Sequence, residues 1–217
     1  MTKFYHKVDF KLSDTAKQWV IDRYADKFKT QFYHDADVTQ VFSEQAQQEW
    51  RSSPLGLEIQ EFLDQYGLDT TFFGITAFVH NHDEPYLGNP HVDSVVDRDL
   101  NFTRLKTRLN IMVLGNPDDP MEWWEGLDFD DDRYVSADYK TIDAIPFTYP
   151  KSIPGVTKED KFKFLGEPTL VVKDALTPSA FVKTDCVHNV SLSPGPRLIV
   201  TVCFDKTIDE ILSLHTV

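Results

Sequence analysis

The stretch Ala180–Phe204, "AFVKTDCVHNVSLSPGPRLIVTVCF", consists of two β-branched, aromatic-rich runs separated by the turn-forming residues "SPGP". Runs of this composition, bounded by Pro and Gly, are typical of β-strands. In the first run, alternation with a period of two predicts one strand that carries His188 on the same face as Val182. The second run begins at Arg197, and the turn predicts a hairpin that brings His188 near Arg197.

Working outward, short strand-like runs separated by Pro, Gly, Asn and Asp continue back to about residue 70. They are "TTFFGITAFVHN", "TRLNIMVLG", "MEWWEG", "YVSADYK" and "TLVVKDAL". Before them, helical stripes of apolar residues predict two amphipathic helices, over residues 12–31 and 54–68. Helices followed by many strands without helical crossovers favour an antiparallel barrel or two-sheet jelly roll with helices against one face, and not a parallel α/β fold.

The chain of 217 residues is expected to form a single domain. It divides into a helical N-terminal buttress (1–70), a β core (71–205) and a C-terminal tail (206–217). The Pro-rich segment "IPFTYPKSIPG", from 145 to 155, predicts a long loop or rim segment.

The formal net charge of −13 argues against nucleic acid as a partner, because phosphate recognition needs a basic surface. The acidic runs "NPDDPMEWWEGLDFDDDRY" and "HNHDEPY" are expected to face water. No segment has the unbroken apolar length of a membrane span, and the first residues lack the pattern of a secretory signal. Two cysteines, Cys186 and Cys203, without C-x-x-C spacing fit buried thiols, so we expect a cytoplasmic protein.

The tripeptide His91-Val92-Asp93 follows a turn-forming Asn-Pro pair near the middle of the chain. In an extended segment residues i and i+2 point to the same side, so both side chains could hold one metal ion. His188 is the candidate for a third ligand from a strand distant in sequence. Two imidazoles and one carboxylate leave three adjacent positions open, which is the arrangement of non-haem Fe(II) sites that bind a cosubstrate and O₂.

Arg197 follows His188 by nine residues. A guanidinium stays charged and can hold a carboxylate through two parallel hydrogen bonds. Iron ligands beside such a group point to a 2-oxo acid as cosubstrate.

With these four residues the sequence resembles the Fe(II)- and 2-oxoglutarate-dependent dioxygenases, in particular their prolyl-hydroxylase-like branch, over residues 71–205. Their signature is H-x-D, a distant His, and an Arg about ten residues later. The resemblance implies a double-stranded β-helix (a jelly roll or cupin-like barrel), with Fe(II) held by His91, Asp93 and His188. It also implies a hydroxylase that couples oxidative decarboxylation of 2-oxoglutarate to oxidation of an unidentified amino acid, peptide or small metabolite, with ascorbate as the reductant.

The resemblance also bears on the residues around the cosubstrate. The strand "RLNIMVLG" is similar to the one that follows H-x-D in the family and offers Asn110 as a contact, although period two also allows Arg108 or Met112. The family often has Ser or Thr two residues after the Arg, where this chain has Ile199. Thr201, two positions further on the same face, is expected to substitute for it.

Aromatic residues are the candidates for walls of a substrate pocket, because catalytic cavities are largely apolar. They are Trp123, Trp124 and Tyr86. The ordinary alternative for the two tryptophans is a strand with one indole in the core and one outside. The expected partner is a small molecule or peptide, with no membrane, and the oligomeric state stays open.

Two other classes of protein remain open. A cupin-type metal enzyme would use His80 and His82, which with Gly74 and Glu84 partly match the first cupin motif, although the spacing fails after His82. A non-catalytic jelly-roll module would use its His and Asp residues for structure or for binding a divalent ion.

Overall fold

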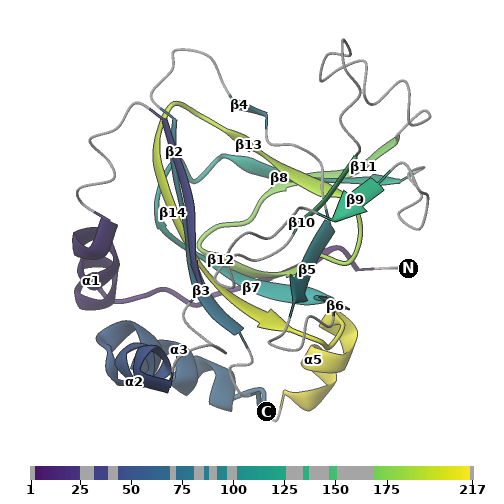
Figure 1. Ribbon diagram of the computed structural model, residues 1–217. Helices are drawn as coiled ribbons and strands as arrows, with labels where there is room; N and C mark the ends of the chain where they lie inside the picture. Colours follow the sequence, from purple (N-terminus) through teal and green to yellow (C-terminus); the bar gives the residue numbers. More distant parts are fainter. Residues whose placement is uncertain are drawn as a thin grey trace.

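The computed structural model describes residues 3–24, 32–38, 44–68, 72–80, 86–87, 92–96, 102–125, 134–136, 147–150 and 169–215. These residues form antiparallel sheets with helices on one side (Figure 1). Within these ranges, no helix is both long enough and apolar enough to cross a bilayer.

The larger sheet has six strands in the order β1-β12-β7-β14-β3-β2, and all neighbours are antiparallel. The strands are β1 (Tyr5–Val8), β12 (Ser179–Lys183), β7 (Thr107–Leu114), β14 (Gly195–Phe204), β3 (Phe72–His80) and β2 (Phe32–Val38). The long central strand β14 holds the sheet together, because it pairs with β3 along one edge and with β7 along the other.

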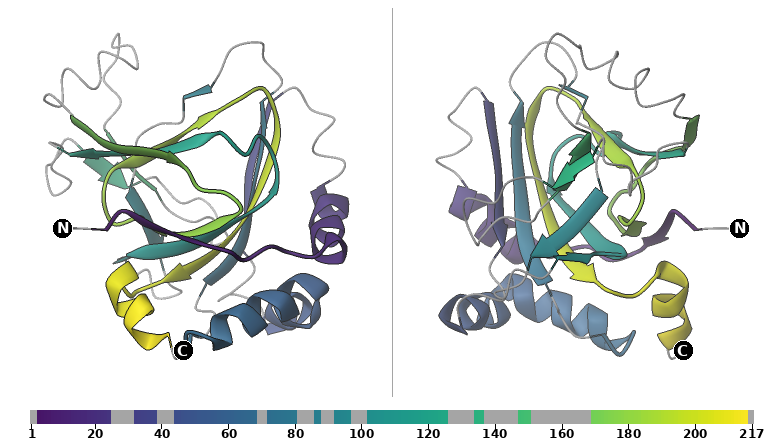
Figure 2. Two further views of the ribbon diagram at one scale, coloured as in Figure 1. Left: turned by 180° about the vertical axis from the view of Figure 1, so that it is seen from behind. Right: turned by 45° about the vertical axis from the view of Figure 1, so that its right-hand side comes forward.

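A second sheet has four strands in the order β11-β8-β13-β4. The strands are β11 (Thr169–Ala175), β8 (Pro120–Glu125), β13 (His188–Leu192) and β4 (Tyr86–Leu87). The two sheets enclose a common interior in all the views (Figure 2).

The order of these strands defines the fold. Along the chain, β3, β7, β12 and β14 belong to the larger sheet, while β4, β8, β11 and β13 belong to the smaller one. The spatial orders 1-8-3-6 and 2-7-4-5 of these eight strands are those of two Greek keys wound into a double-sheet jelly roll. The predicted fold class, a double-stranded β-helix with N-terminal helices, is therefore confirmed.

A third sheet, β6-β5-β10-β9, is built from shorter strands. Its members are β6 (Phe102–Arg104), β5 (Val92–Val96), β10 (Phe147–Pro150) and β9 (Tyr134–Ser136). The Pro-rich segment predicted as a loop thus includes β10.

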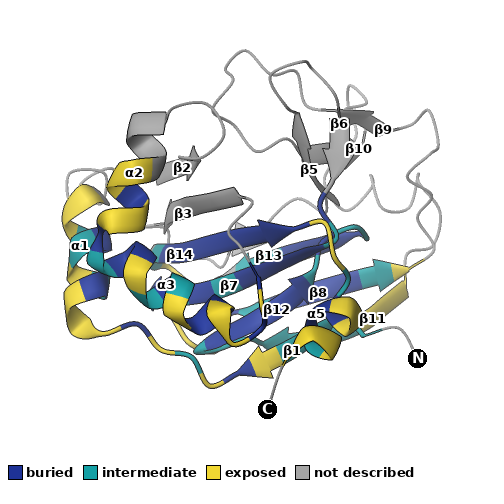
Figure 3. Ribbon diagram, turned by 90° about the horizontal axis from the view of Figure 1, so that it is seen from below, coloured by how far each residue is buried: buried dark blue, intermediate teal, exposed yellow. Residues whose placement is uncertain are grey.

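The helices cover the outer face of the larger sheet (Figure 3). They are α1 (Asp14–Tyr24), α2 (Glu44–Ser52), α3 (Pro54–Asp64) and α5 (Ile208–Leu214). Ser53 starts α3, where its side chain accepts a hydrogen bond from the amide of Gly56, and Thr207 starts α5 with a capping box. Buried residues of all four helices form one cluster with alternate residues of β7 and β14, and this cluster is the larger part of the hydrophobic core described.

A smaller core cluster lies between the sheets. Met121 and Trp123 of β8 pack against Ala180 and Val182 of β12. At the open edge, Tyr5 of β1 donates a 2.5 Å hydrogen bond to Asp174 of β11. This bond joins the edge strand of one sheet to the edge strand of the other.

Three details differ from the sequence prediction. The run Ala180–Leu192 is not one strand, because the chain crosses between the sheets after β12 and begins β13 at His188. The predicted hairpin is wrong for the same reason: β13 and β14 follow each other but pair with different neighbours. The N-terminal 70 residues also include the strands β1 and β2, and residues 206–217 include the helix α5.

Candidate active site in the barrel interior

His188 is the first residue of β13 and pairs with Trp123 of β8. Directly paired residues share a face, and Trp123 lies in the core between the sheets, so the imidazole faces the interior. The side chain is buried, and Nδ1 lies 2.9 Å from the carbonyl oxygen of Cys186. Because a carbonyl only accepts, Nδ1 is the donor in this contact, which fixes the orientation of the ring. A backbone carbonyl commonly orients a metal-binding histidine in this way.

Asn110 and Thr201 lie on the inner face of the larger sheet, so their side chains point into the same interior as His188. They are direct partners across β7 and β14. Their neighbours Leu109, Ile111, Val200 and Val202 pack under the helices, so the alternation of each strand turns Asn110 and Thr201 the other way. The Asn110 Oδ1 atom is buried and has no hydrogen-bond partner in the described part of the chain. A buried amide of this kind is suited to a polar ligand.

Arg197 lies on the same face of β14 as Thr201, with buried Ile199 between them. The residue as a whole is half-buried, but its Nε is fully buried and finds no hydrogen-bond acceptor among the residues placed by the structure. Burial lowers the pKa of the guanidinium to about 10, and the negative charge of Asp119 opposes that shift. Arg197 therefore remains a cation at neutral pH, and an anionic ligand would satisfy it.

The side chains of the other two predicted metal ligands, His91 and Asp93, are not described by the structure. His91 lies outside the described residues, and Asp93 is placed only through its backbone, which pairs in β5 with Phe147 of β10. Within the described ranges, no group of three His, Cys, Asp or Glu side chains is arranged as a metal site. The ligand set His91, Asp93 and His188 thus stays a prediction.

The aromatic candidates separate into different environments. Trp123 is fully buried, stacks on Tyr5 and donates from its indole to the carbonyl of Lys183 at 2.9 Å. Trp124 lies on the opposite face, half-buried, and donates to Asn189 Oδ1 at 2.6 Å. One indole in the core and one outside is the ordinary strand arrangement. Tyr86 pairs through its backbone with Leu192, and its side chain lies outside the described part.

The cupin-type alternative rests on two histidines that the structure places only in part. His80 ends β3 and pairs by its backbone with Gly195, whereas His82 lies outside the described residues.

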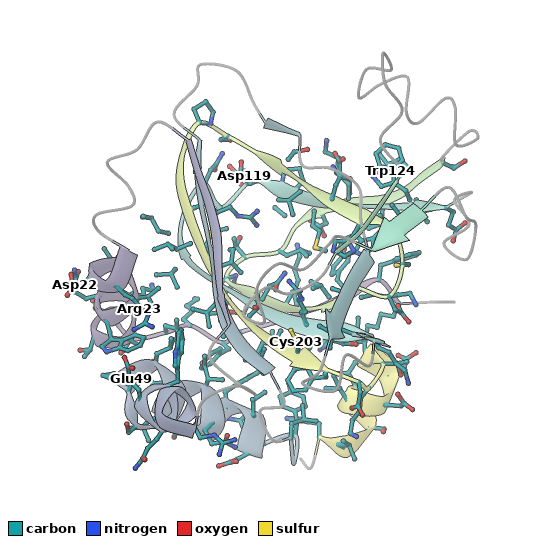
Figure 4. The ribbon with its side chains drawn as sticks, in the orientation of Figure 1. Asp22, Arg23, Glu49, Asp119, Trp124 and Cys203 are labelled. Atoms are coloured by element: carbon teal, nitrogen blue, oxygen red, sulfur yellow. The ribbon has the colours of Figure 1, made fainter. Side chains whose placement is uncertain are left out.

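Sequence reasoning missed the contribution of the acidic run after β7. Asp119 and Glu122 were expected to face water, yet they are only 6% and 5% exposed. Glu122 accepts a hydrogen bond from Asn189 and forms a 2.7 Å ion pair with Lys173 on the outer face of the smaller sheet. Asp119 lies beside the turn between β13 and β14 (Figure 4). The strand alternation of "PMEWWE" predicts only that Glu122 lies on the outer face; its burial there depends on Asn189 and Lys173 of neighbouring strands, and no local pattern predicts the burial of Asp119.

The chain is similar in structure to several solved proteins. A viral collagen prolyl hydroxylase from Paramecium bursaria Chlorella virus 1, in a 2OG complex, is 12% identical and covers 93% of this chain and 94% of its own, with a TM-score of 0.42. HygX from Streptomyces hygroscopicus, with nickel, 2-oxoglutarate and hygromycin B bound, is 10% identical over 92% of this chain and 82% of its own, with a TM-score of 0.39. AviO1 from Streptomyces viridochromogenes is 12% identical over 95% of this chain and 92% of its own, with a TM-score of 0.38.

No model of a known family matches the chain, and no curated protein matches it in sequence. The fold class follows from the strand order of the chain itself.

The interior therefore combines two kinds of chemistry on facing walls. One wall presents a buried imidazole, a side chain of the kind that binds metals, and the other presents a buried cation and an amide that suit a carboxylate. Such a pair of walls can hold a ligand that chelates a metal at one end and carries a negative charge at the other.

Proposed function

We propose that this chain is a non-haem Fe(II) dioxygenase that couples oxidative decarboxylation of 2-oxoglutarate to hydroxylation of a small molecule or peptide. The observation that carries the proposal is the opposition of His188 on the smaller sheet to Arg197, Asn110 and Thr201 on the larger one. A dicarboxylate carries two anionic ends, one of which can chelate a metal while the other pairs with a guanidinium.

His91, Asp93 and His188 would hold Fe(II). The pairing of β4 with β13 supports the inclusion of His91: Leu87 pairs with Ser191, and the antiparallel strand then runs toward His188. His91 follows Leu87 by four positions and His188 precedes Ser191 by three, so the intervening chain, which can span about 14 Å, is long enough.

The bound iron would supply activation of O₂ and oxidation of an unreactive C–H bond, with ascorbate as the reductant in assays. The protein's own residues bind and orient. Arg197 would hold the far carboxylate of 2-oxoglutarate, with Asn110 and Thr201 as the neighbouring polar contacts. Ile199 lies where the family often has Ser or Thr. The second contact to the far carboxylate would therefore come from Thr201, two residues further along the same face of β14.

The proposal is tested by anaerobic addition of Fe(II) and 2-oxoglutarate to the purified protein. A weak visible absorption band is expected, and H91A, D93A and H188A should each lose it. His215→Ala is the matched control, because His215 caps α5 at the chain terminus, far in sequence from the three ligands. Retention of the band in all three variants would overturn the ligand assignment.

A second measurement separates the remaining classes of protein. Incubation with Fe(II), ascorbate and 2-oxoglutarate should yield succinate without an added substrate. Complete absence of succinate, together with absence of the band, would favour a non-catalytic module. Metal binding that survives H188A but not a change at His80 or His82 would favour the cupin-type enzyme.

A further inference from the structure

The turn between β7 and β8, residues Gly115–Asp119, contacts the stem of Arg197. Gly115 has a φ of +139°, and a Cβ built there would lie 3.1 Å from Arg197 Cγ and 3.5 Å from Arg197 Cβ. Carbon atoms pack favourably at about 3.5–4.0 Å, so a Cβ at this position would require the arginine stem to shift by a few tenths of an ångström. Glycine is therefore required both for the backbone conformation and for the room that Arg197 occupies.

The same turn is fastened to the connection between β13 and β14. Asp119 Oδ1 accepts hydrogen bonds from the backbone N–H of Ser193 at 2.9 Å and from its hydroxyl at 2.6 Å. Asn116 Nδ2 donates to the Ser193 hydroxyl at 2.8 Å. Ser193 lies between the strand that begins with His188 and the strand that carries Arg197. The three hydrogen bonds hold these two strand ends against the turn.

Asp119 also acts through its charge. Its carboxylate is buried and lies close enough to Arg197 to favour the charged guanidinium. In a partly desolvated region, such a charge changes the affinity of the guanidinium for any other anion.

We infer that the β7–β8 turn is the positioning element of Arg197, with Gly115 providing room for the stem and Asp119 holding the turn and balancing the cation. The inference rests on the proposed function only for the identity of the ligand, because the position of Arg197 can be measured without one. Gly115, Asn116, Asp119 and Ser193 are thus positioning residues.

The first test compares G115A with G67A. Gly67, just beyond the C-terminal end of α3, also has a positive φ of +56°, but a Cβ there would meet nothing within 4 Å. Both variants lose the freedom of glycine, and only G115A displaces Arg197. Labelling of Arg197 by phenylglyoxal, followed by mass spectrometry, should be about threefold faster in G115A because displacement of the stem makes the terminal guanidinium nitrogens, which the reagent attacks, more accessible. G67A should label like the parent protein.

Affinity provides the second readout. With Mn(II) present, calorimetry should show 2-oxoglutarate binding about tenfold more weakly to G115A, which is about 1.4 kcal/mol, and unchanged binding to G67A. Metal affinity should be unchanged in both variants. Equal labelling and equal ligand affinity in G115A and the parent protein would overturn the inference.

The charge of Asp119 is tested by D119N, which keeps an oxygen for Ser193. Removing a nearby negative charge should tighten 2-oxoglutarate binding about fivefold. D118N makes the same charge change one residue earlier at an exposed position and should alter binding by less than about twofold. Equal effects of D119N and D118N would contradict a local role for Asp119.

The outcomes separate the inference from the proposed function. If the parent protein does not bind 2-oxoglutarate at all, the proposed function fails, while the labelling rates of G115A and G67A still decide whether the turn positions Arg197.

Discussion

Asn110 of β7 and Thr201 of β14 are directly paired across the larger sheet, with both side chains turned into the barrel interior. Residues 91 positions apart in the chain thereby become neighbours on the face that also carries Arg197. The pair lies at the centre of the sheet, where β14 is hydrogen-bonded to a neighbouring strand on both edges. A polar pair on such a scaffold is expected to bind through fixed contacts and not by induced fit.

The pair should bind the cosubstrate as a unit. N110A and T201V should each weaken 2-oxoglutarate binding about fivefold, and the double variant should lose less than the sum of the two free energies, since neighbours share one ligand. Calorimetry with Mn(II) measures the three affinities. T184V is the control: Thr184 is also buried, but its hydroxyl donates to the carbonyl of Leu105 at 3.0 Å, so the variant should lose stability and not affinity. Strict additivity would mean that the two residues act separately.

Arg197 should lower the stability of the folded protein while it enables binding of 2-oxoglutarate. Its buried guanidinium has a pKa lowered to about 10, so the charged form is costly in the folded protein. R197M keeps the apolar stem and removes the charge, and should raise the melting temperature by about 2–4 °C while abolishing 2-oxoglutarate binding. R23M is the contrast, because Arg23 forms a 3.1 Å ion pair with Glu49 and lies over Trp50, so its loss should not stabilise. A lower melting temperature for R197M would assign Arg197 a structural role.

The Tyr5–Asp174 bond should shape the pH dependence of stability at both extremes. The hydrogen bond from Tyr5 lowers the pKa of Asp174, so its stabilisation is present above the ordinary carboxyl pKa and is lost as the pH falls through the lowered value. The same bond raises the pKa of Tyr5, so that stabilisation is present below the ordinary phenol pKa and is lost as the pH rises through the raised value.

Y5F should therefore lower the free energy of unfolding by about 1 kcal/mol near neutral pH and by less at both extremes of pH. The expected loss is small because the bond is partly exposed and solvent screens it. Urea unfolding at about pH 3, 7 and 11 measures the profile. Tyr66→Phe is the control, because burial alone raises the pKa of Tyr66 and no carboxylate takes part. An acid limb that is identical in Y5F and the parent protein would exclude the coupling.

The two tryptophans should respond differently to the same substitution. W123F removes a fully buried indole and its hydrogen bond to the Lys183 carbonyl, and should cost about 2–3 kcal/mol of stability. W124F removes a half-buried indole bonded to Asn189 and should cost about 1 kcal/mol. Denaturant unfolding compares them. A W123F variant with parental stability and a changed Michaelis constant would instead identify Trp123 as a pocket wall.

The fold class and several side-chain directions were predictable from local patterns. The alternation of "RLIVTVCF" separates Arg197 and Thr201 from the residues that pack under the helices, because a strand turns successive side chains to opposite faces. The period of "RLNIMVL" places Asn110, Arg108 and Met112 on the inner face in the same way, and turn residues mark where most strands end. These features depend only on neighbours in the chain.

Features that depend on pairing between distant segments could not be predicted. The run Ala180–Leu192 has one continuous strand-like pattern. The chain nevertheless crosses from one sheet to the other at Thr184–Val187, because β12 pairs with strands of the larger sheet and β13 with strands of the smaller one. The burial of Asp119 requires Ser193 beside it, 74 positions away in sequence, and nothing local distinguishes it from exposed Asp118.

The sequence by itself thus determined which residue types alternate along each strand, and with them the chemistry available to the interior. Only the tertiary structure decided which walls those residues share: the register of β14 against β7 pairs Thr201 with Asn110, and the jelly-roll crossing sets His188 opposite them. The physical reason is that side-chain alternation is a local property of the backbone, whereas register and sheet membership are settled by packing among segments that meet only in the folded chain.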